Sequence, residues 1–147
     1  MRALIQRVSR ASVMVEGKIT GMIDKGILVF LGVREEDEEK DGIFLAEKIV
    51  NLRIFEDPAG KMNLSLLEVG AKLMVVSQFT LYGNCDKGRR PSFTGAAQPV
   101  KAELLYNRFV EYITAKYDVK VQTGIFGAHM DVELINSGPV TFMLESR

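Results

Sequence analysis

An almost uninterrupted run of apolar residues, Ile27–Val33 (ILVFLGV), constrains the fold more than any other feature of the sequence. The run is too short to cross a membrane as a helix, which needs about 20 apolar residues. Continuous rather than alternating hydrophobicity is typical of a strand buried on both faces, as in the parallel sheets of α/β proteins. A second such run, Lys72–Phe79, follows later in the chain. We therefore expect two strands at the centre of a covered sheet.

The remaining segments predict further strands and two helices. Turn signals between β-prone runs predict strands at Ala3–Val8, Ser12–Val15, Lys18–Ile23, Leu52–Glu56, Val119–Thr123, Met130–Ile135 and Val140–Leu144. The acidic block Glu35–Asp41 is predicted to form a solvated loop and the first turn of a helix, whose apolar stripe ends at Val50. A second helix is predicted from Pro99 to about Tyr117. This order of elements predicts one layered α/β domain over residues 1–147.

Composition argues against several classes of protein. The chain carries 19 basic and 19 acidic residues, so any contact with nucleic acid must use a local basic patch. One cysteine and one histidine rule out an internal disulfide and argue against a zinc site. The N-terminal residues lack the apolar core of a secretory signal, and no stretch approaches the length of a membrane span. We expect a cytoplasmic protein without a metal or cofactor.

The second apolar run passes into a polar segment, Ser77–Gly83 (SQFTLYG). Binding and catalytic residues commonly lie where a strand ends and in the loop beyond it. Ser77 and Thr80 are candidate nucleophiles in this segment, and Gln78 is a candidate hydrogen-bond donor. Hydroxyl side chains also cap backbone groups at strand ends. The residues alone therefore leave a catalytic and a structural interpretation open.

A basic loop follows this segment closely. It spans Asp86–Pro91 and contains Lys87, Arg89 and Arg90. Three cations beside a glycine could hold phosphate groups. A solvated surface loop has the same composition, so both interpretations stay open.

The segment Asn136–Thr141 places Gly138–Pro139 between two predicted strands, which is a turn signal. An ordinary trans turn is the default, because only about 5% of X-Pro bonds in folded proteins are cis. A cis bond would present two carbonyl groups in a rigid edge. Such an edge could hold an amino group and leave no room for a side chain on one side of Cα, which would separate D- from L-amino acids by steric exclusion.

Conventional catalytic signatures are missing from the sequence. Cys85 lacks the sequence context of a thiol protease, and His129 is better explained as a surface or loop residue than as a general base. There is no G-x-S-x-G nucleophile elbow, no P-loop and no G-x-G-x-x-G fingerprint. The residues by themselves therefore do not select a reaction.

Five segments in order along the chain resemble those of the D-aminoacyl-tRNA deacylases, a family first named for D-Tyr-tRNA(Tyr). Each segment is weakly specific alone, but their order and spacing together are strongly specific, and the resemblance covers essentially the whole chain. The five segments are Met1–Val8 (MRALIQRV), Ser77–Leu81 (SQFTL), Lys87–Phe93 (KGRRPSF), Gly124–Met130 (GIFGAHM) and Asn136–Thr141 (NSGPVT).

The resemblance implies a three-layer α/β/β domain with a mixed or antiparallel sheet and two main helices, acting as a homodimer. Gly138–Pro139 corresponds to the family's cis Gly-Pro motif, which enters the active site of the partner subunit and excludes L-amino acids. Arg7 matches a residue that helps to orient this motif. The implied partner is the acceptor end of D-aminoacyl-tRNA, with neither a membrane nor DNA as a partner.

The resemblance also assigns roles at the end of the second apolar run. Ser77 to Thr80 match a strand end that lines the pocket for the terminal adenosine. The backbone of Phe79 is implied to contact the substrate, and Thr80 was the family's early candidate for a nucleophile. Met130 matches a position near the adenine.

The implied reaction is hydrolysis of the ester bond of D-aminoacyl-tRNA, and of glycyl-tRNA, to free amino acid and tRNA. An aminoacyl ester is already activated, so positioning and oxyanion stabilisation are the main requirements. In the family, the terminal ribose 2′-OH is thought to assist the attack of water. We expect backbone N–H groups around Gln78 to Thr80 to hold the ester. Lys87, Arg89 and Arg90 are expected to contact the tRNA. Two alternatives stay open: a tRNA acceptor-end binding module without turnover, and an amidase or esterase of small molecules.

Overall fold

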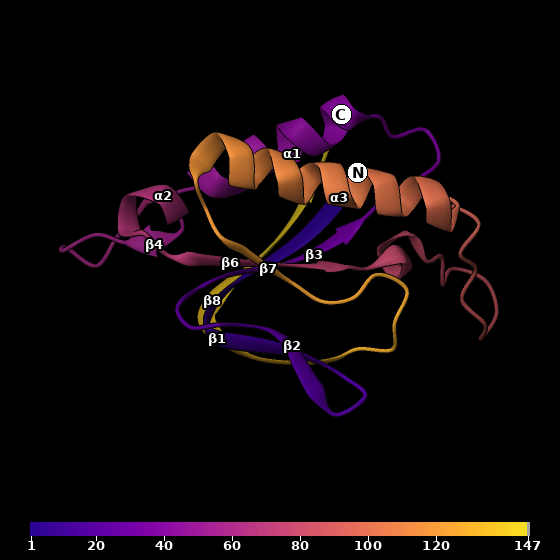
Figure 1. The fold of residues 1–147 in the computed structure, drawn as a ribbon, viewed down its shortest axis with the longest axis horizontal. Coiled ribbons are helices and arrows are strands. Elements are labelled where there is room, and N and C mark those ends of the chain that lie inside the picture. Colours follow the sequence, from indigo (N-terminus) through magenta and orange to yellow (C-terminus); the bar gives the residue numbers. More distant parts are fainter. Residues whose placement is uncertain (147) are drawn as a thin grey trace.

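The computed structural model describes residues 1–146 (Figure 1). The eight strands are β1 Arg2–Val15, β2 Lys18–Ile23, β3 Gly26–Gly32, β4 Phe55–Glu56, β5 Met62–Leu64, β6 Lys72–Ser77, β7 Val121–Thr123 and β8 Asp131–Glu145. The helices are α1 Glu39–Asn51, α2 Leu66–Val69 and α3 Pro99–Tyr117, and a 3-10 turn, η1, spans Phe79–Tyr82. No helix in this part of the chain is long and apolar enough to cross a membrane.

The main sheet has six strands and is mixed, as expected. Its order is β2-β1-β3-β6-β7, with β8 paired to the other edge of β1. The β3–β6 and β6–β7 pairs are parallel, whereas β1 pairs antiparallel with β2, β3 and β8. The two apolar runs therefore form adjacent parallel strands at the centre of the sheet, with their carboxyl ends at the same edge.

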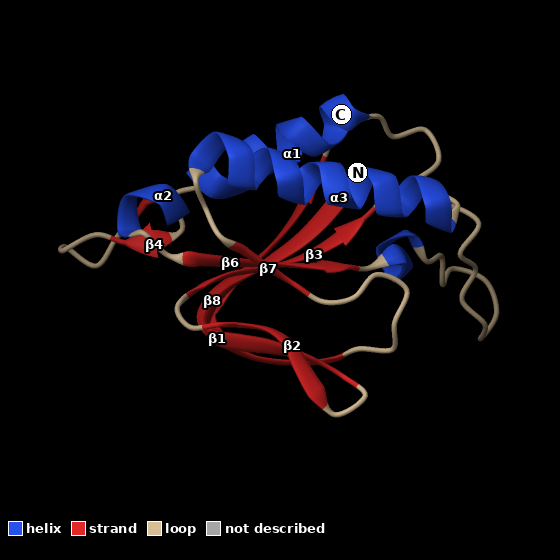
Figure 2. Cartoon of the chain, in the orientation of Figure 1, coloured by secondary structure: helices blue, strands red, loops and turns tan. Residues whose placement is uncertain are grey.

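Hydrophobic residues form two clusters, one on each face of the central strands. Figure 2 shows α1 and α3 covering one face, and the larger cluster lies beneath them. On the other face, β1 and β8 curve over together with β2, and enclose a second cluster around Leu28, Met74 and Val76. The sheet curls far enough for a Cβ at Gly21 of β2 to lie 2.5 Å from the Thr123 carbonyl oxygen of β7. Glycine is therefore required at position 21.

Two long strands replace four short ones that the sequence predicted. The predicted break between Ala3–Val8 and Ser12–Val15 is wrong, because β1 continues through it with two shifts in its register to β8. The buried side chains of β1 pass from one cluster to the other between Ile5 and Val8, and two exposed residues follow, which interrupts the hydrophobic pattern without ending the strand. The predicted break around Gly138–Pro139 is also wrong, because β8 continues through it. β8 pairs with β1 alone, and a proline without an N–H is tolerated in an edge strand.

The helices follow the prediction closely, with one addition. α3 begins at Pro99 and ends at Tyr117, as predicted. The short helix α2 was not predicted, although Ser65 and Glu68 form a capping box at its start. The predicted strand Leu52–Glu56 is reduced to β4, because residues 52–54, which follow the end of α1, do not pair with another strand.

A buried ion pair ties the start of β1 to the loop before α1. The α-amino group of Met1 lies 2.6 Å from Asp37 Oδ1, with both side chains at most 1% exposed. Asp37 Oδ2 also accepts a hydrogen bond from the Arg34 N–H at 2.8 Å. The Met1 ammonium donates in addition to the Ser146 hydroxyl.

Replacing Asp37 by alanine is expected to lower the free energy of unfolding by about 3–5 kcal/mol, because the ammonium group then stays buried without its anion. The matched control is Asp24→Ala, which removes the exposed Asp24–Lys72 pair of 2.8 Å and is expected to change stability little. Urea unfolding of both variants measures the difference. Equal losses in the two variants would contradict a buried role for Asp37.

Candidate active site

A cavity of about 510 Å³ opens at the carboxyl edge of the parallel strands, beside the start of α3. Four of the predicted site residues line it: Ser77, Gln78, Phe79 and Met130. Ser77 ends β6, and Met130 comes from the loop between β7 and β8. Ligand sites in α/β proteins typically occupy this edge, where loops follow the strands. The structure thus brings together two segments that lie more than 50 residues apart in the sequence.

The strand predicted to reach Phe79 ends instead at Ser77, and the chain turns into η1. The Gln78 N–H still donates to the Leu31 carbonyl oxygen at 2.8 Å, so the turn begins at a fixed point on β3. Gly32 lets the turn pack closely, since a Cβ there would lie 3.0 Å from the Gln78 carbonyl oxygen. The backbone of η1 is therefore held tightly against the sheet.

The start of this turn presents unpaired backbone donors. The first N–H groups of a helical turn have no partner within it. No hydrogen bond among residues 1–146 uses the N–H of Phe79 or Thr80. Both residues are exposed, Phe79 at 55%. Phe79 lines the cavity, whereas Thr80, the next residue, is not among the lining residues. Two adjacent free N–H groups are the chemistry that stabilises a developing oxyanion.

The side chains at the site do not form a nucleophile–base pair. The Thr80 hydroxyl accepts a hydrogen bond from the Gln78 amide. Within the described chain, neither Ser77 nor Thr80 hydrogen-bonds a carboxylate or imidazole group. Serine and threonine nucleophiles need an adjacent base for activation. The geometry therefore favours attack by an outside nucleophile over attack by either hydroxyl.

Besides Phe79, three aromatic side chains to which the sequence assigned no role form the walls of the cavity: Phe93, Tyr106 and Phe126. The rings of Phe79 and Phe93 meet edge to face, with centroids 5.1 Å apart. Tyr106 and Phe126 lie 6.0 Å apart, and the Tyr106 hydroxyl donates to the Val75 carbonyl oxygen at 2.8 Å. Burial raises the pKa of Tyr106 to about 12, so it remains a neutral donor at physiological pH. Tyr106 follows Ala102 by one helical turn and could have been identified from that spacing. Phe93 was marked only as the end of the Lys87–Phe93 segment, without a role at the site.

The lining of the cavity contains few ionisable side chains. Among its described residues there is no Asp, Glu, Lys or Arg, and His129 is the one imidazole. His129 lies in an exposed loop, as predicted, although it also lines the cavity. An aromatic cavity with a few polar groups suits a stacked base and a neutral ester more than a phosphate.

The basic loop lies beside the cavity rather than in it. Lys87, Arg89 and Arg90 are exposed and are not among the lining residues. Backbone hydrogen bonds of 2.8 and 2.9 Å between Asn84 and Ser92 close the loop at its base. Phe93 follows directly and packs on Phe79. The three cations are thus presented to solvent near the cavity.

Gly138–Pro139 and Arg7 are brought together, but away from this cavity. The peptide bond between Gly138 and Pro139 is cis. The Arg7 guanidinium donates to the Ser137 carbonyl oxygen at 2.9 Å and to the Ile54 carbonyl oxygen at 2.7 Å. Arg7 pairs with Ile27 at the start of β3, whereas the cavity lies at its end.

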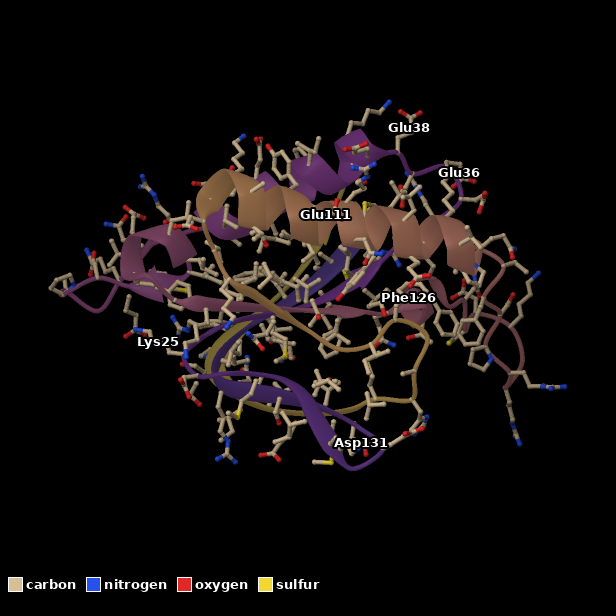
Figure 3. The ribbon with its side chains drawn as sticks, viewed as in Figure 1. Lys25, Glu36, Glu38, Glu111, Phe126 and Asp131 are labelled. Carbon is tan, nitrogen blue, oxygen red and sulfur yellow. The ribbon has the colours of Figure 1, made fainter. Side chains whose placement is uncertain are left out.

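Figure 3 shows the two regions on opposite sides of the molecule. Phe126, which lines the large cavity, lies at one side, and Lys25 lies at the other. Lys25 lines a smaller cavity of about 210 Å³ together with Arg7 and Ser137. The Gly138–Pro139 segment therefore does not line the large cavity of its own chain.

Comparison with known proteins identifies the family. The sequence model of the D-Tyr-tRNA(Tyr) deacylases matches residues 4–145. The chain belongs to this family. The D-aminoacyl-tRNA deacylase of Desulfatibacillum aliphaticivorans is 60% identical, with 100% of both chains covered. That of Thermosipho melanesiensis is 56% identical, over 100% of this chain and 98% of its own. The chain is accordingly a hydrolase with the activity of a D-aminoacyl-tRNA deacylase.

Two solved structures with the same fold are described as proteins with different functions. One, described as a c-Myc DNA unwinding element binding protein, has a TM-score of 0.92 and 42% identity, over 100% of this chain and 99% of its own. Another, described as a probable eukaryotic D-amino acid tRNA deacylase, has a TM-score of 0.85, with 98% of each chain covered. At 18% identity the second supports the fold alone.

Proposed function

We propose that this deacylase hydrolyses the ester bond of D-aminoacyl-tRNA in the cavity beside η1 and excludes L-amino acids with Gly138–Pro139 of a second subunit. The observation that carries the proposal is the free N–H group of Phe79, which lines an aromatic cavity, together with the free N–H group of the adjacent Thr80. They are placed to receive the charge that develops on the ester carbonyl oxygen. The tRNA stays outside, and its terminal adenosine enters.

The separation of Gly138–Pro139 from the cavity supports a homodimer. Because the segment does not line its own cavity, it can select a substrate only at a neighbouring subunit. β8 is an edge strand, and it exposes the apolar residues Ile135, Phe142 and Met143. Exposed apolar edge strands are normally covered by another chain. A two-fold arrangement would give each site a Gly138–Pro139 segment from its partner.

Positioning carries most of the proposed catalysis. Phe79 and Thr80 hold the ester through their N–H groups, while Ser77 and Gln78 shape the floor and Met130 lies against the adenine. Water attacks with assistance from the ribose 2′-OH, since no side-chain base pairs with Thr80 in the described residues. An activated ester needs little more than this, because orientation and oxyanion stabilisation lower its barrier.

Salt dependence distinguishes a tRNA substrate from a free small ester. Phosphate contacts by Lys87, Arg89 and Arg90 make binding weaken steeply as salt rises. Replacing all three by glutamine is expected to raise KM for D-Tyr-tRNA and to flatten the slope of log KM against log salt by about 2–3. The control replaces Lys18, Lys40 and Lys61, which lie outside this loop. Equal slopes in the two variants would contradict tRNA contact by the loop.

One similar structure is described as a DNA-binding protein, so duplex DNA is a useful competitor. Measuring KM for D-Tyr-tRNA in the presence of excess duplex DNA tests whether Lys87, Arg89 and Arg90 contact nucleic acid in general. Inhibition by uncharged tRNA at concentrations where duplex DNA has no effect supports an RNA partner. Equal inhibition by both would favour binding to any phosphate backbone.

Glycyl-tRNA is expected to be cleaved as well. Glycine has no side chain for Gly138–Pro139 to exclude, so its ester can occupy the same position as a D-aminoacyl ester. Release of radiolabelled glycine should therefore rise with enzyme concentration, whereas L-tyrosine release should not. Complete absence of glycine release at high enzyme concentration would contradict exclusion by side-chain clash.

A further inference from the structure

The first residue of β1 reaches the turn that forms the candidate site. Arg2 stands between Gly32 of β3 and Glu145 of β8 in the sheet. Its Nη1 donates to the Leu81 carbonyl oxygen at 2.6 Å, and its Nε donates to Glu145 Oε1 at 2.6 Å. Its guanidinium carbon lies 4.8 Å from the centroid of the Tyr82 ring. One side chain thus contacts the end of η1 twice and is itself held by β8.

The Leu81 carbonyl is a group that a helical turn leaves without a partner. The last carbonyls of a helix lack an N–H donor within it. A cationic side chain satisfies them and suits the negative end of the turn. Among the side-chain hydrogen bonds within residues 1–146, only the one donated by Arg2 has a carbonyl oxygen of η1 as its acceptor. The guanidinium also stacks on Tyr82, which fixes the orientation of the turn as well as its end.

We propose that Arg2 is a positioning residue for deacylation, which caps η1 at Leu81 and so holds the N–H groups of Phe79 and Thr80 at the ester. Arg2 does not line the cavity, so it acts through the turn and not on the substrate. Gln78 and Gly32 fix the start of η1 against β3, and Arg2 fixes its end. This inference rests on the proposed function, because it needs the two N–H groups to contact the ester.

The test compares Arg2→Met with Arg10→Met. Arg10 lies on the same strand and forms an ion pair of 2.8 Å with Glu133, again across the β1–β8 pair, but it does not contact η1. Arg2→Met is expected to lower kcat for D-Tyr-tRNA by about ten- to a hundredfold, because small displacements of orienting groups have effects of that size. KM and the thermal midpoint should stay close to those of Arg10→Met, which should keep wild-type kcat.

Two further variants separate capping from the ion pair. Glu145→Gln keeps the Leu81 contact and should retain most of the kcat. Arg2→Lys keeps the charge but loses the planar fork, so its kcat should fall between wild type and Arg2→Met. If Arg2→Met does not fold, Arg2→Lys and Tyr82→Leu carry the same comparison, and both should lower kcat without raising KM.

The outcomes distinguish this inference from the proposed function. If the wild-type enzyme does not release D-tyrosine, the proposed function fails. If the wild type is active and Arg2→Met has the same kcat as Arg10→Met, the proposed function stands and the positioning role of Arg2 is overturned. A fall in kcat that follows only a fall in the thermal midpoint overturns it as well, because it would mark Arg2 as a general stabiliser.

Discussion

Replacing Phe79 by proline is expected to lower kcat for D-Tyr-tRNA by about 10²- to 10³-fold relative to Phe79→Ala, which is the usual loss when one oxyanion donor is removed. Proline removes the N–H and keeps the backbone path. Phe79 is the first residue of η1, a position that suits proline. Gln78 before it lies outside the helical region, with φ −147° and ψ 81°. Single-turnover release of D-tyrosine measures the effect.

Phe79→Ala is the control that isolates the N–H group. It loses the ring and its edge-to-face contact with Phe93, so it should mainly raise KM. Equal kcat in the proline and alanine variants would contradict a role for the Phe79 N–H.

Thr80→Ala should retain turnover, because the hydroxyl is accessory. Loss of turnover in Thr80→Ala with tRNA binding intact would contradict the mechanism in which the ribose 2′-OH, and not the Thr80 hydroxyl, assists the attack of water.

Substituting Gly138 by alanine is expected to reduce kcat/KM for D-Tyr-tRNA by about 100-fold and to shrink the preference for D over L. A Cβ at position 138 would lie 2.4 Å from Asn136 Oδ1. Asn136 cannot move freely, because its amide donates to the Arg7 and Val140 carbonyl oxygens at 3.2 and 3.0 Å. The segment that we propose to enter the partner's site must therefore shift. Initial rates on D-Tyr-tRNA and L-Tyr-tRNA measure both effects.

Ser137→Ala is the matched control, since it leaves the carbonyl that accepts from Arg7 in place and should keep wild-type rates.

Mixing subunits tests whether the Gly138–Pro139 segment acts across a dimer. Heterodimers of Phe79→Pro and Gly138→Ala subunits contain one intact site, so a mixture should recover about a quarter of the wild-type activity. Recovery of no activity after subunit exchange would contradict a shared site.

Much of the architecture could be predicted from patterns that depend on nearby residues. The apolar runs gave β3 and β6, and Pro99 with its helical stripe gave the bounds of α3. β1 was predicted in two pieces because its buried side chains pass from one hydrophobic cluster to the other between Ile5 and Val8, and exposed Ser9 and Arg10 follow. Only the curled sheet explains this change. α2 has four residues and is too short for a periodic signal.

Some of the residues that line the cavity could be predicted from the sequence, but the geometry of the cavity could not. The polar segment after the second run marked Ser77 to Thr80. Ser77, Gln78 and Phe79 line the cavity, and Thr80 does not. Physical pattern could not show that Phe93 and Tyr106 close the same cavity, because they come from a loop and a helix that meet η1 only in the fold. Nor could it show that Arg2 reaches Leu81, since this contact spans 79 positions of the sequence.

The most direct test of chiral editing is paired release of tyrosine from D-Tyr-tRNA and L-Tyr-tRNA at the same enzyme concentration. The cavity and the proposed partner segment predict rapid release of D-tyrosine and no release of L-tyrosine above the uncatalysed rate. Equal release of both would contradict exclusion by Gly138–Pro139 and would leave an esterase of aminoacyl-tRNA without chiral selection.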